Sequence, residues 1–409
     1  RLVAGSLYGD ISLFDLEKLT GLGTGDDIDS AWTQLPGHAG KLEFMRFDRE
    51  GRRLATGAWR SNRVAIWDLN DLAAEPLWIT LPERNRVHLT GVALDPQGRY
   101  LVAATYAGDA WMWDLQHPQR VPRQLAAERF GMERIAVDPA GRWLVSWGGF
   151  KRNVELWRLD QPAEDPVTSS RFDGEVRGVA FDPNGRWLAV ATGDPRTHGG
   201  RTGKVVVFDL EGDVAAEPIV LPVPAVVEAI PVFDPVGRWL AVAHGDNTVG
   251  LWDPRNPAAP RQILRGHEDK VQSLAFSPDG SRLVTGSRNR QLRIWTLPHA
   301  AASPLVIARG GAGIAPGIAF EPKGNRLATV FKGERLMLWR PDAPLEPEQV
   351  LGGPEQRDGT SPVFAPNGRW LAISPDLNLW DLRRPEAEPF SLENHGGRVW
   401  PRLAFDPEG

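Results

Sequence analysis

The chain contains no cysteine among its 409 residues, which excludes disulfide bonds, thiolate metal sites and a cysteine nucleophile. Its apolar runs are short and bounded by turn residues, so the sequence predicts no membrane-spanning segment and no membrane partner. Excess basic charge is also lacking, because the formal net charge is −5. A general nucleic-acid binder usually carries a basic field, so we expect no nucleic-acid partner.

Patterns that carry catalysis are missing too. The eight histidines show no His-x-x-x-His or related ligand spacing, and no glycine-rich loop follows a phosphate-binding pattern. Pairs of acidic residues such as Asp26-Asp27 fall in loops, where they are better read as solvated groups than as acid–base pairs. We therefore predict no catalytic residue, no metal site and no cofactor.

Turn formers and tryptophan are abundant. The chain has 43 glycines, 35 prolines and 17 tryptophans, against only 3 tyrosines. Frequent glycine and proline without low-complexity runs indicate many short strands joined by tight turns.

A repeat of about 43 residues runs through the chain. One copy reads "AFDPNGRWLAVAT" from Ala180, and a closely related copy reads "VFDPVGRWLAVAH" from Val232. The apolar residues before Asp-Pro predict a first strand, and Asp-Pro-x-Gly predicts a tight turn whose glycine adopts a positive φ. The run Trp187–Ala191 after the turn is continuously apolar, which predicts a second strand buried on both faces.

A third strand ends in Trp-Asp or a related pair, and a more polar fourth strand follows. Four short strands per repeat correspond to one four-stranded antiparallel blade. The tryptophans that end the third strands are predicted to be structural, namely Trp67, Trp113, Trp157, Trp252, Trp295, Trp339 and Trp380.

These motifs resemble the WD-repeat (WD40) β-propeller family. The strongest copy is Leu264–Leu297, which has a Gly-His pair, an inner strand, a Pro-x-Gly turn and a terminal tryptophan. The resemblance implies an all-β propeller of four-stranded antiparallel blades, with about nine repeats. It also implies an internal network of structural side chains, here His267, Thr285 or Ser287, and Trp295. The aspartate of that network is replaced by Asn289, so we expect the network to be degenerate.

Eight repeats are complete and the ninth is split between the termini. Val399–Gly409 would supply a first strand and turn, and Leu2–Leu16 would supply the next two strands. We interpret residues 1–409 as one propeller of about nine blades closed by the split repeat. The alternative is a slice of a longer array that forms two smaller rings. Because the chain starts at Arg1 without an initiator methionine, we expect it to be part of a longer protein.

Arginine and aromatic residues gather in two sets of loops. In the WD-repeat family, the loops between the second and third strands and those between blades share one face. Arginine, tryptophan and tyrosine are common at interface hot spots. We therefore predict a partner-binding face made by Trp59, Arg60, Arg84, Arg86, Tyr106, Arg129, Phe130, Trp147, Arg171, Phe172, Arg288, Arg357, Arg398 and Trp400.

The sequence thus favours a non-catalytic interaction scaffold or sensor that binds a protein or peptide, or another domain of the same polypeptide. The regular "DPxGRWLA" copies resemble bacterial WD-repeat arrays attached to signalling ATPases or kinases, so we expect a cytoplasmic signalling role. One alternative is an enzymatic propeller, hydrolase-like or quinoprotein-like, with a site in its central channel. A second alternative is a purely structural scaffold.

Overall fold

The computed structural model describes most of the chain. The described residues are 1–20, 22, 29–82, 88–106, 108–127, 134–148, 152–161, 166–172, 174–193, 203–214, 216–223, 227, 229–256, 262–297, 304–308, 317–331, 335–343, 346–352, 361–374, 377–392 and 402–407. They form nine four-stranded antiparallel sheets, which confirms the predicted all-β fold of nine propeller blades. No helix among them is long and apolar enough to cross a membrane.

The chain divides into two compact units. Unit 1 comprises Arg1–Arg171, Ala365–Trp380 and Pro389–Gly409. Its strands are β1 (Leu2–Gly5), β2 (Ile11–Phe14), β3 (Trp32–Leu35), β4 (Leu42–Phe47), β5 (Arg53–Ala58), β6 (Arg63–Asp68), β7 (Leu77–Thr80), β8 (Leu89–Leu94), β9 (Tyr100–Thr105), β10 (Asp109–Asp114), β11 (Arg123–Ala127), β12 (Arg134–Val137), β13 (Trp143–Trp147), β14 (Asn153–Arg158), β15 (Thr168–Arg171), β33 (Trp370–Ser374), β34 (Asn378–Asp381), β35 (Phe390–Ser391) and β36 (Arg402–Phe405).

Unit 2 comprises Phe172–Phe364 and Asp381–Glu388. Its strands are β16 (Glu175–Phe181), β17 (Trp187–Gly193), β18 (Gly203–Asp209), β19 (Ile219–Leu221), β20 (Val232–Phe233), β21 (Leu240–Ala243), β22 (Val249–Trp252), β23 (Gln262–Leu264), β24 (Val271–Phe276), β25 (Arg282–Ser287), β26 (Gln291–Thr296), β27 (Leu305–Ala308), β28 (Gly317–Phe320), β29 (Leu327–Val330), β30 (Met337–Trp339), β31 (Gln349–Val350) and β32 (Ser361–Phe364).

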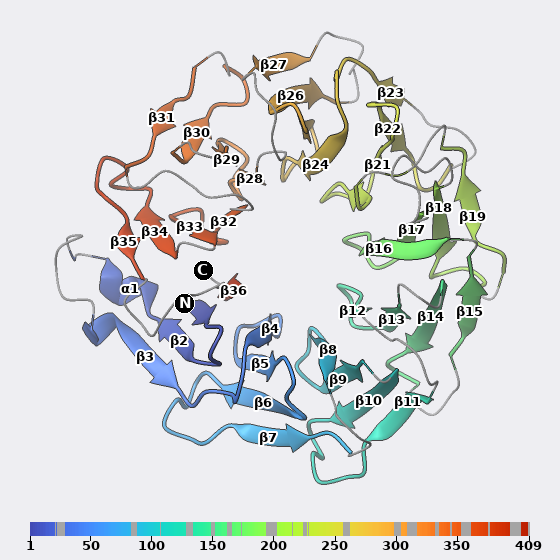
Figure 1. Cartoon of the computed structure of the whole chain (residues 1–409), viewed down its shortest axis with the longest axis vertical. Helices are drawn as coiled ribbons and strands as arrows, with labels where there is room; N and C mark the ends of the chain where they lie inside the picture. The colour runs from blue at the N-terminus through green and yellow to red at the C-terminus, as the bar shows by residue number, and fades with distance from the viewer. Residues whose placement is uncertain are drawn as a thin grey trace. The chain divides into compact units, whose positions relative to one another are not determined.

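One sheet of unit 1 is built from both ends of the chain, as the split repeat predicted. Its strand order is β3-β2-β1-β36, and β1 pairs with β36 in the register Leu2 opposite Phe405 and Gly5 opposite Arg402. Figure 1 shows the blue N-terminal strands beside the red strand β36. The pairing gives β1 a hydrogen-bonded neighbour on each side, so this strand is not an exposed sheet edge.

Second strands supply the centre of the core. All seven residues of β17 are buried, as the continuous apolar run predicted. In unit 2, Ala189 and Val205 of one sheet pack with Leu240 and Trp252 of the next in a single hydrophobic cluster. Within each unit, neighbouring sheets also meet through their first strands: β36, β4, β8 and β12 in unit 1, and β16, β20, β24 and β28 in unit 2.

The Asp-Pro-x-Gly turns are capped by their own aspartates. In unit 2, Oδ1 of Asp234 accepts hydrogen bonds from the backbone N–H groups of Arg238 and Trp239, at 2.5 and 2.7 Å. Gly237 adopts a φ of 74°, as the turn motif predicted. The carboxylate thus satisfies backbone donors that the turn leaves without partners, and Asp138 does the same in unit 1.

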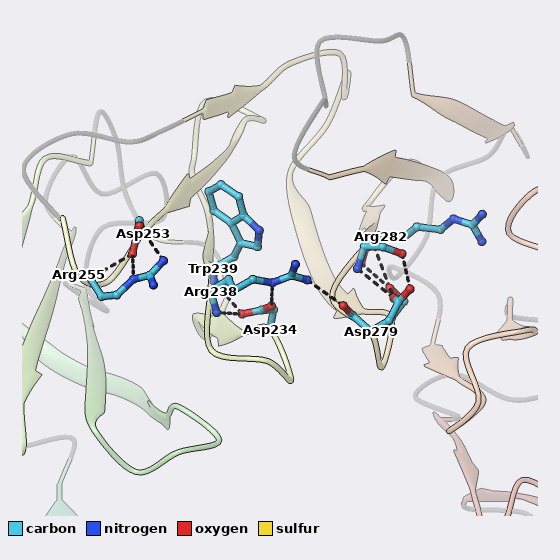
Figure 2. A network of polar contacts seen from close by, with 9 residues as sticks. Asp234, Arg238, Trp239, Asp253, Arg255, Asp279 and Arg282 are labelled. Atoms are coloured by element: carbon cyan, nitrogen blue, oxygen red, sulfur yellow. Dashed lines mark hydrogen bonds and ion pairs between the residues drawn. The ribbon is translucent and has the colours of Figure 1, made fainter.

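The arginine after the turn glycine joins neighbouring turns. Figure 2 shows Arg238 beside Asp234, with its guanidinium directed toward Asp279 of the next sheet. Nη2 of Arg238 donates to the backbone carbonyl of Asp279 at 2.8 Å. Elsewhere the same arginine pairs with the aspartate that ends the third strand: Nη2 of Arg186 lies 3.0 Å from Oδ2 of Asp209. Arg99 and Asp114 make the same contact in unit 1, with Nη2 of Arg99 3.2 Å from Oδ2 of Asp114.

Buried histidine, threonine and tryptophan side chains form a hydrogen-bonded chain in the sheet containing β25. Nε2 of His267 lies 2.6 Å from Oγ1 of Thr285, and Nε1 of Trp295 donates to the same oxygen at 2.9 Å. Ser287 instead donates to Asn289, at 2.5 Å. The remaining third-strand tryptophans that the sequence marked as structural are also buried, namely Trp67, Trp113, Trp157, Trp252, Trp339 and Trp380.

The loop after β2 contains a short helix that the repeat pattern did not predict. Helix α1 (Leu16–Leu19) begins after Asp15, whose Oδ1 accepts a hydrogen bond from the backbone N–H of Glu17 at 3.1 Å. A 3-10 turn, η1 (Asp29–Ala31), precedes β3. An aspartate before a helix is a common N-cap, because its side chain accepts from the free N–H groups of the first turn.

The threonine position can be tested by exchanging threonine and valine between two sheets. Val242 occupies the position of Thr285, because Leu240 pairs with Trp252 as Leu283 pairs with Trp295. Among the described residues, Nε1 of Trp252 has no hydrogen-bond partner. Thr285→Val should lower the free energy of unfolding by about 1–3 kcal/mol, because buried donors lose their acceptor, whereas Val242→Thr should raise it by about 1 kcal/mol. Denaturant titration measures both, and equal losses in the two variants would contradict this account.

Stability should fall as the pH is lowered. Burial, the main cause, lowers the pKa values of His38, His244 and His267 from 6.5 to about 4. Between these values the unfolded chain binds more protons than the folded chain, so the free energy of unfolding decreases from pH 6.5 toward pH 4. Burial raises the pKa values of Asp95 and Asp138, which opposes the loss at the acidic end.

His267→Gln separates the contribution of one histidine. Each such group contributes a slope of up to about 1.4 kcal/mol per pH unit. The variant should therefore show a flatter dependence of stability on pH between 6.5 and 4, whatever its stability at pH 8. Parallel curves for the two proteins would contradict the prediction.

Candidate functional site

A hollow of about 650 Å³ in unit 1 brings together three of the predicted binding residues. Trp59, Tyr106 and Trp147 come from three successive sheets and line it together. The first strands β4, β8 and β12 supply the rest of the lining, namely Glu43, Phe44, Arg46, Thr90, Gly91, Val92, Arg134, Ile135 and Ala136. The volume lies within the roughly 300–1,000 Å³ typical of ligand pockets.

Equivalent backbone hydrogen bonds position two of the aromatic residues. Trp59 follows β5 and donates its backbone N–H to the carbonyl of Lys41 at 2.7 Å. Tyr106 follows β9 and donates to the carbonyl of His88 at 2.8 Å. Each residue is thus held at the point where the second strand leaves its pairing with the first. Trp147 is the last residue of β13 and pairs directly with Arg134.

Two first strands carry a β-bulge at the hollow. The register of β4 with β5 shifts between Leu42 and Phe44, and that of β8 with β9 shifts between Leu89 and Gly91. Glu43 and Thr90 are the extra residues, and both line the hollow. A bulge re-aims side chains that regular alternation would direct elsewhere. The same shift occurs in β16 and β24 of unit 2, so it is a feature of the repeat.

The three aromatic side chains differ in exposure. Tyr106 is 59% exposed and Trp59 is 40% exposed, whereas Trp147 is 9% exposed. The Trp59 ring stacks on the His88 ring with centroids 5.8 Å apart and an interplanar angle of 9°. Trp147 therefore forms a wall of the hollow, and Trp59 and Tyr106 offer accessible aromatic surface.

Positive charge exceeds negative charge in the lining. Arg46 on β4 and Arg134 on β12 are exposed, and Glu43 is the carboxylate among the described lining residues. Glu43 forms an ion pair with Lys41. Gly91 lies between the arginine-bearing strands, where a Cβ would collide with Ile135. The absence of a side chain there lets β8 approach β12 closely.

Other predicted face residues lie at the ends of second or fourth strands. Arg60 follows Trp59 with a φ of 63°, a left-handed conformation that costs an ordinary residue about 1 kcal/mol or more. Arg288 of unit 2 follows β25 and donates its backbone N–H to the carbonyl of Lys270 at 2.9 Å. The backbone of Arg171 ends β15, and Phe172 comes next. The remaining predictions lie outside the described residues, namely Arg84, Arg86, Arg129, Phe130, Arg357, Arg398 and Trp400.

Sequence reasoning missed the first-strand residues of the site. Arg46 and Arg134 were not predicted, because the repeat pattern indicates that first strands consist of apolar core residues. The sequence feature that could have identified them is a charged residue inside or at the start of a strand whose other residues are mostly apolar. The described residues contain no group of three or more histidines and carboxylates that could hold a metal ion.

Comparisons with known proteins identify the repeats. The family model described as "WD domain, G-beta repeat" (WD40) matches residues 166–209, 224–253 and 258–296. Guanine nucleotide-binding protein subunit beta-2 of Caenorhabditis elegans is 33% identical over 108 residues, which are 25% of this chain and 28% of that protein. WD repeat-containing protein 90 of Homo sapiens is 29% identical over 219 residues, which are 49% of this chain and 12% of that protein.

A further relative is Telomerase Cajal body protein 1 of Homo sapiens, 32% identical over 92 residues, which are 22% of this chain and 17% of that protein. The chain therefore matches at most 28% of the length of these three relatives. All three come from animals, so the resemblance to bacterial arrays stays a prediction.

Among solved structures, one titled "Crystal structure of the eukaryotic initiation factor" matches with a TM-score of 0.68 and 12% identity, covering 100% of this chain and 98% of that one. At this identity the match supports the fold alone. Together with the nine four-stranded sheets, these findings show a nine-bladed β-propeller fold in which residues 166–209, 224–253 and 258–296 match WD40 repeats.

Proposed function

We propose that the chain, as one propeller of residues 1–409, is a non-catalytic interaction scaffold. It binds a protein or peptide segment, which belongs either to another protein or to the same polypeptide. The observation that carries the proposal is the convergence of Trp59, Tyr106 and Trp147 from three sheets on one hollow. Exposed tryptophan and tyrosine beside an open hollow are the side chains that most often dominate binding energy at protein interfaces.

The loop after β5 presents a second exposed side chain beside Trp59, that of Arg60. Arg60 adopts a left-handed conformation that favours glycine, and it directly follows Trp59. A positive φ also occurs at Asn247 and Arg290, in the corresponding turns of two sheets of unit 2, so the turn itself imposes this conformation. An arginine here would present five N–H donors to a partner.

The lining favours binding over catalysis. Glu43 is the one carboxylate among the described lining residues and is already paired with Lys41. General acid–base chemistry with paired carboxylates would need a second such group within reach of the same substrate. A cytoplasmic signalling role is part of the proposal, on the basis of the resemblance to arrays attached to signalling enzymes.

Peptide selection on the purified chain tests the proposed function. Peptides recovered from a random displayed library should bind the wild-type chain and lose about 2 kcal/mol or more of binding free energy with Trp59→Ala or Tyr106→Ala. Calorimetry measures this loss. Because both side chains are substantially exposed, the melting temperatures of the variants should stay close to that of the wild type.

Tyr8→Ala is the matched control. Tyr8 is 64% exposed and lies between β1 and β2, the equivalent loop of another sheet in unit 1, but it does not line the hollow. This variant should bind the selected peptides with wild-type affinity. A library that yields no binding peptide, or peptides that bind all three variants equally well, would contradict the proposal.

A further inference from the structure

The hollow combines aromatic surface with positive charge. Accessible aromatic rings stand at its rim, and two arginines stand on the first strands that flank β8. Neither Arg46 nor Arg134 belongs to the loop residues on which the proposed function was based. Their chemistry therefore gives independent information about the partner.

The excess of positive charge in and beside the hollow favours the binding of a negatively charged partner. The lining has two guanidinium groups and one carboxylate, and Lys41 adds a further ammonium group beside that carboxylate. A basic segment would meet Arg46 and Arg134 with like charge, which disfavours its binding. An acidic segment would place carboxylates near guanidinium groups, whose planar donors match carboxylate geometry.

Apolar surface in the hollow selects for a flat or large apolar side chain. Phe44, Val92 and Ile135 contribute apolar atoms to the lining, and Trp147 forms a mostly buried wall. Trp59 is already oriented by stacking on His88. Aromatic pairs gain about 0.5–1.5 kcal/mol beyond the burial of their area, so a bound aromatic ring has suitable neighbours here.

We propose that the hollow binds an acidic peptide segment that carries one aromatic side chain. The aromatic ring enters beside Trp59 and Tyr106, and carboxylates on either side of it pair with Arg46 and Arg134. This inference rests on the proposed function and specifies the chemistry of its partner.

The experiment uses three labelled peptides flanked by glycine. The first has the sequence Asp-Glu-Trp-Glu-Asp, the second replaces its four acids by lysine, and the third replaces its tryptophan by glycine. Fluorescence anisotropy with the full chain should show that the first peptide binds about tenfold or more tightly than either of the others. Raising the salt concentration from about 50 to about 500 mM should weaken this binding, because exposed charges are screened.

Charge reversal and aromatic truncation then test the two halves of the site. The double variant Arg46→Glu, Arg134→Glu should prefer the lysine peptide over the acidic one. Trp59→Ala combined with Tyr106→Ala should weaken binding of the acidic tryptophan peptide by at least about thirtyfold. Because all four side chains are exposed, circular dichroism should show that both double variants remain folded.

Two matched controls complete the set. Arg49→Glu reverses an exposed arginine in the turn after β4, and Tyr8→Ala removes an exposed tyrosine outside the hollow. Neither should change the affinity for the acidic peptide.

Each failure has its own meaning. If the lysine peptide binds more tightly than the acidic one, or if charge reversal leaves the preference unchanged, the inference about charge is wrong while the scaffold function stands. If acidic binding survives the aromatic double variant, the hollow is not its site. If none of these peptides binds and library selection also yields none, the proposed function itself is wrong.

Discussion

Burial of the second strand on both faces is the constraint on which the rest of the structure depends. A four-stranded sheet cannot cover both of its own faces, so each blade needs a neighbour on each side. In β17 all seven residues are buried, and Trp252 of the following sheet packs in the same cluster as Ala189. The requirement repeats along the chain, and in the sheet at the termini β36 completes the blade by pairing with β1. Stability is therefore shared among contacts between adjacent sheets.

Because the sheets are built alike, each has a corresponding position directly after its second strand. The residue after a second strand is held by one backbone hydrogen bond, and this bond recurs at Trp59, Tyr106 and Arg288. Its side chain is free to vary because the backbone bond does not depend on it. In three neighbouring sheets an aromatic residue lies at this position or at the end of the second strand, namely Trp59, Tyr106 and Trp147. The β-bulges at Glu43 and Thr90 then turn first-strand side chains toward the same space.

The sequence predicted the parts of the structure that depend on local chemistry. The positive φ of Gly237, the burial of Trp187 and the split sheet follow from turn preferences and from apolar patterning. The hollow depends on the register between strands, and a one-residue bulge changes which side chains face it. Pattern reading therefore found Trp59 and Tyr106 but missed Arg46 and Arg134. It also missed helix α1, because Leu2–Leu16 was read as two strands, whereas Asp15 caps a helix that begins at Leu16.

Amide hydrogen exchange, with and without a bound peptide, tests most directly whether partners bind at this end of the sheets. Binding in the hollow should slow exchange in the loops that follow β5 and β9, around Trp59 and Tyr106. It should leave exchange unchanged in the Asp-Pro-x-Gly turn at residues 95–98, at the opposite end of the strands, and in the equivalent turn at residues 48–51. Slower exchange at those turns, with none at the loops after β5 and β9, would contradict the account.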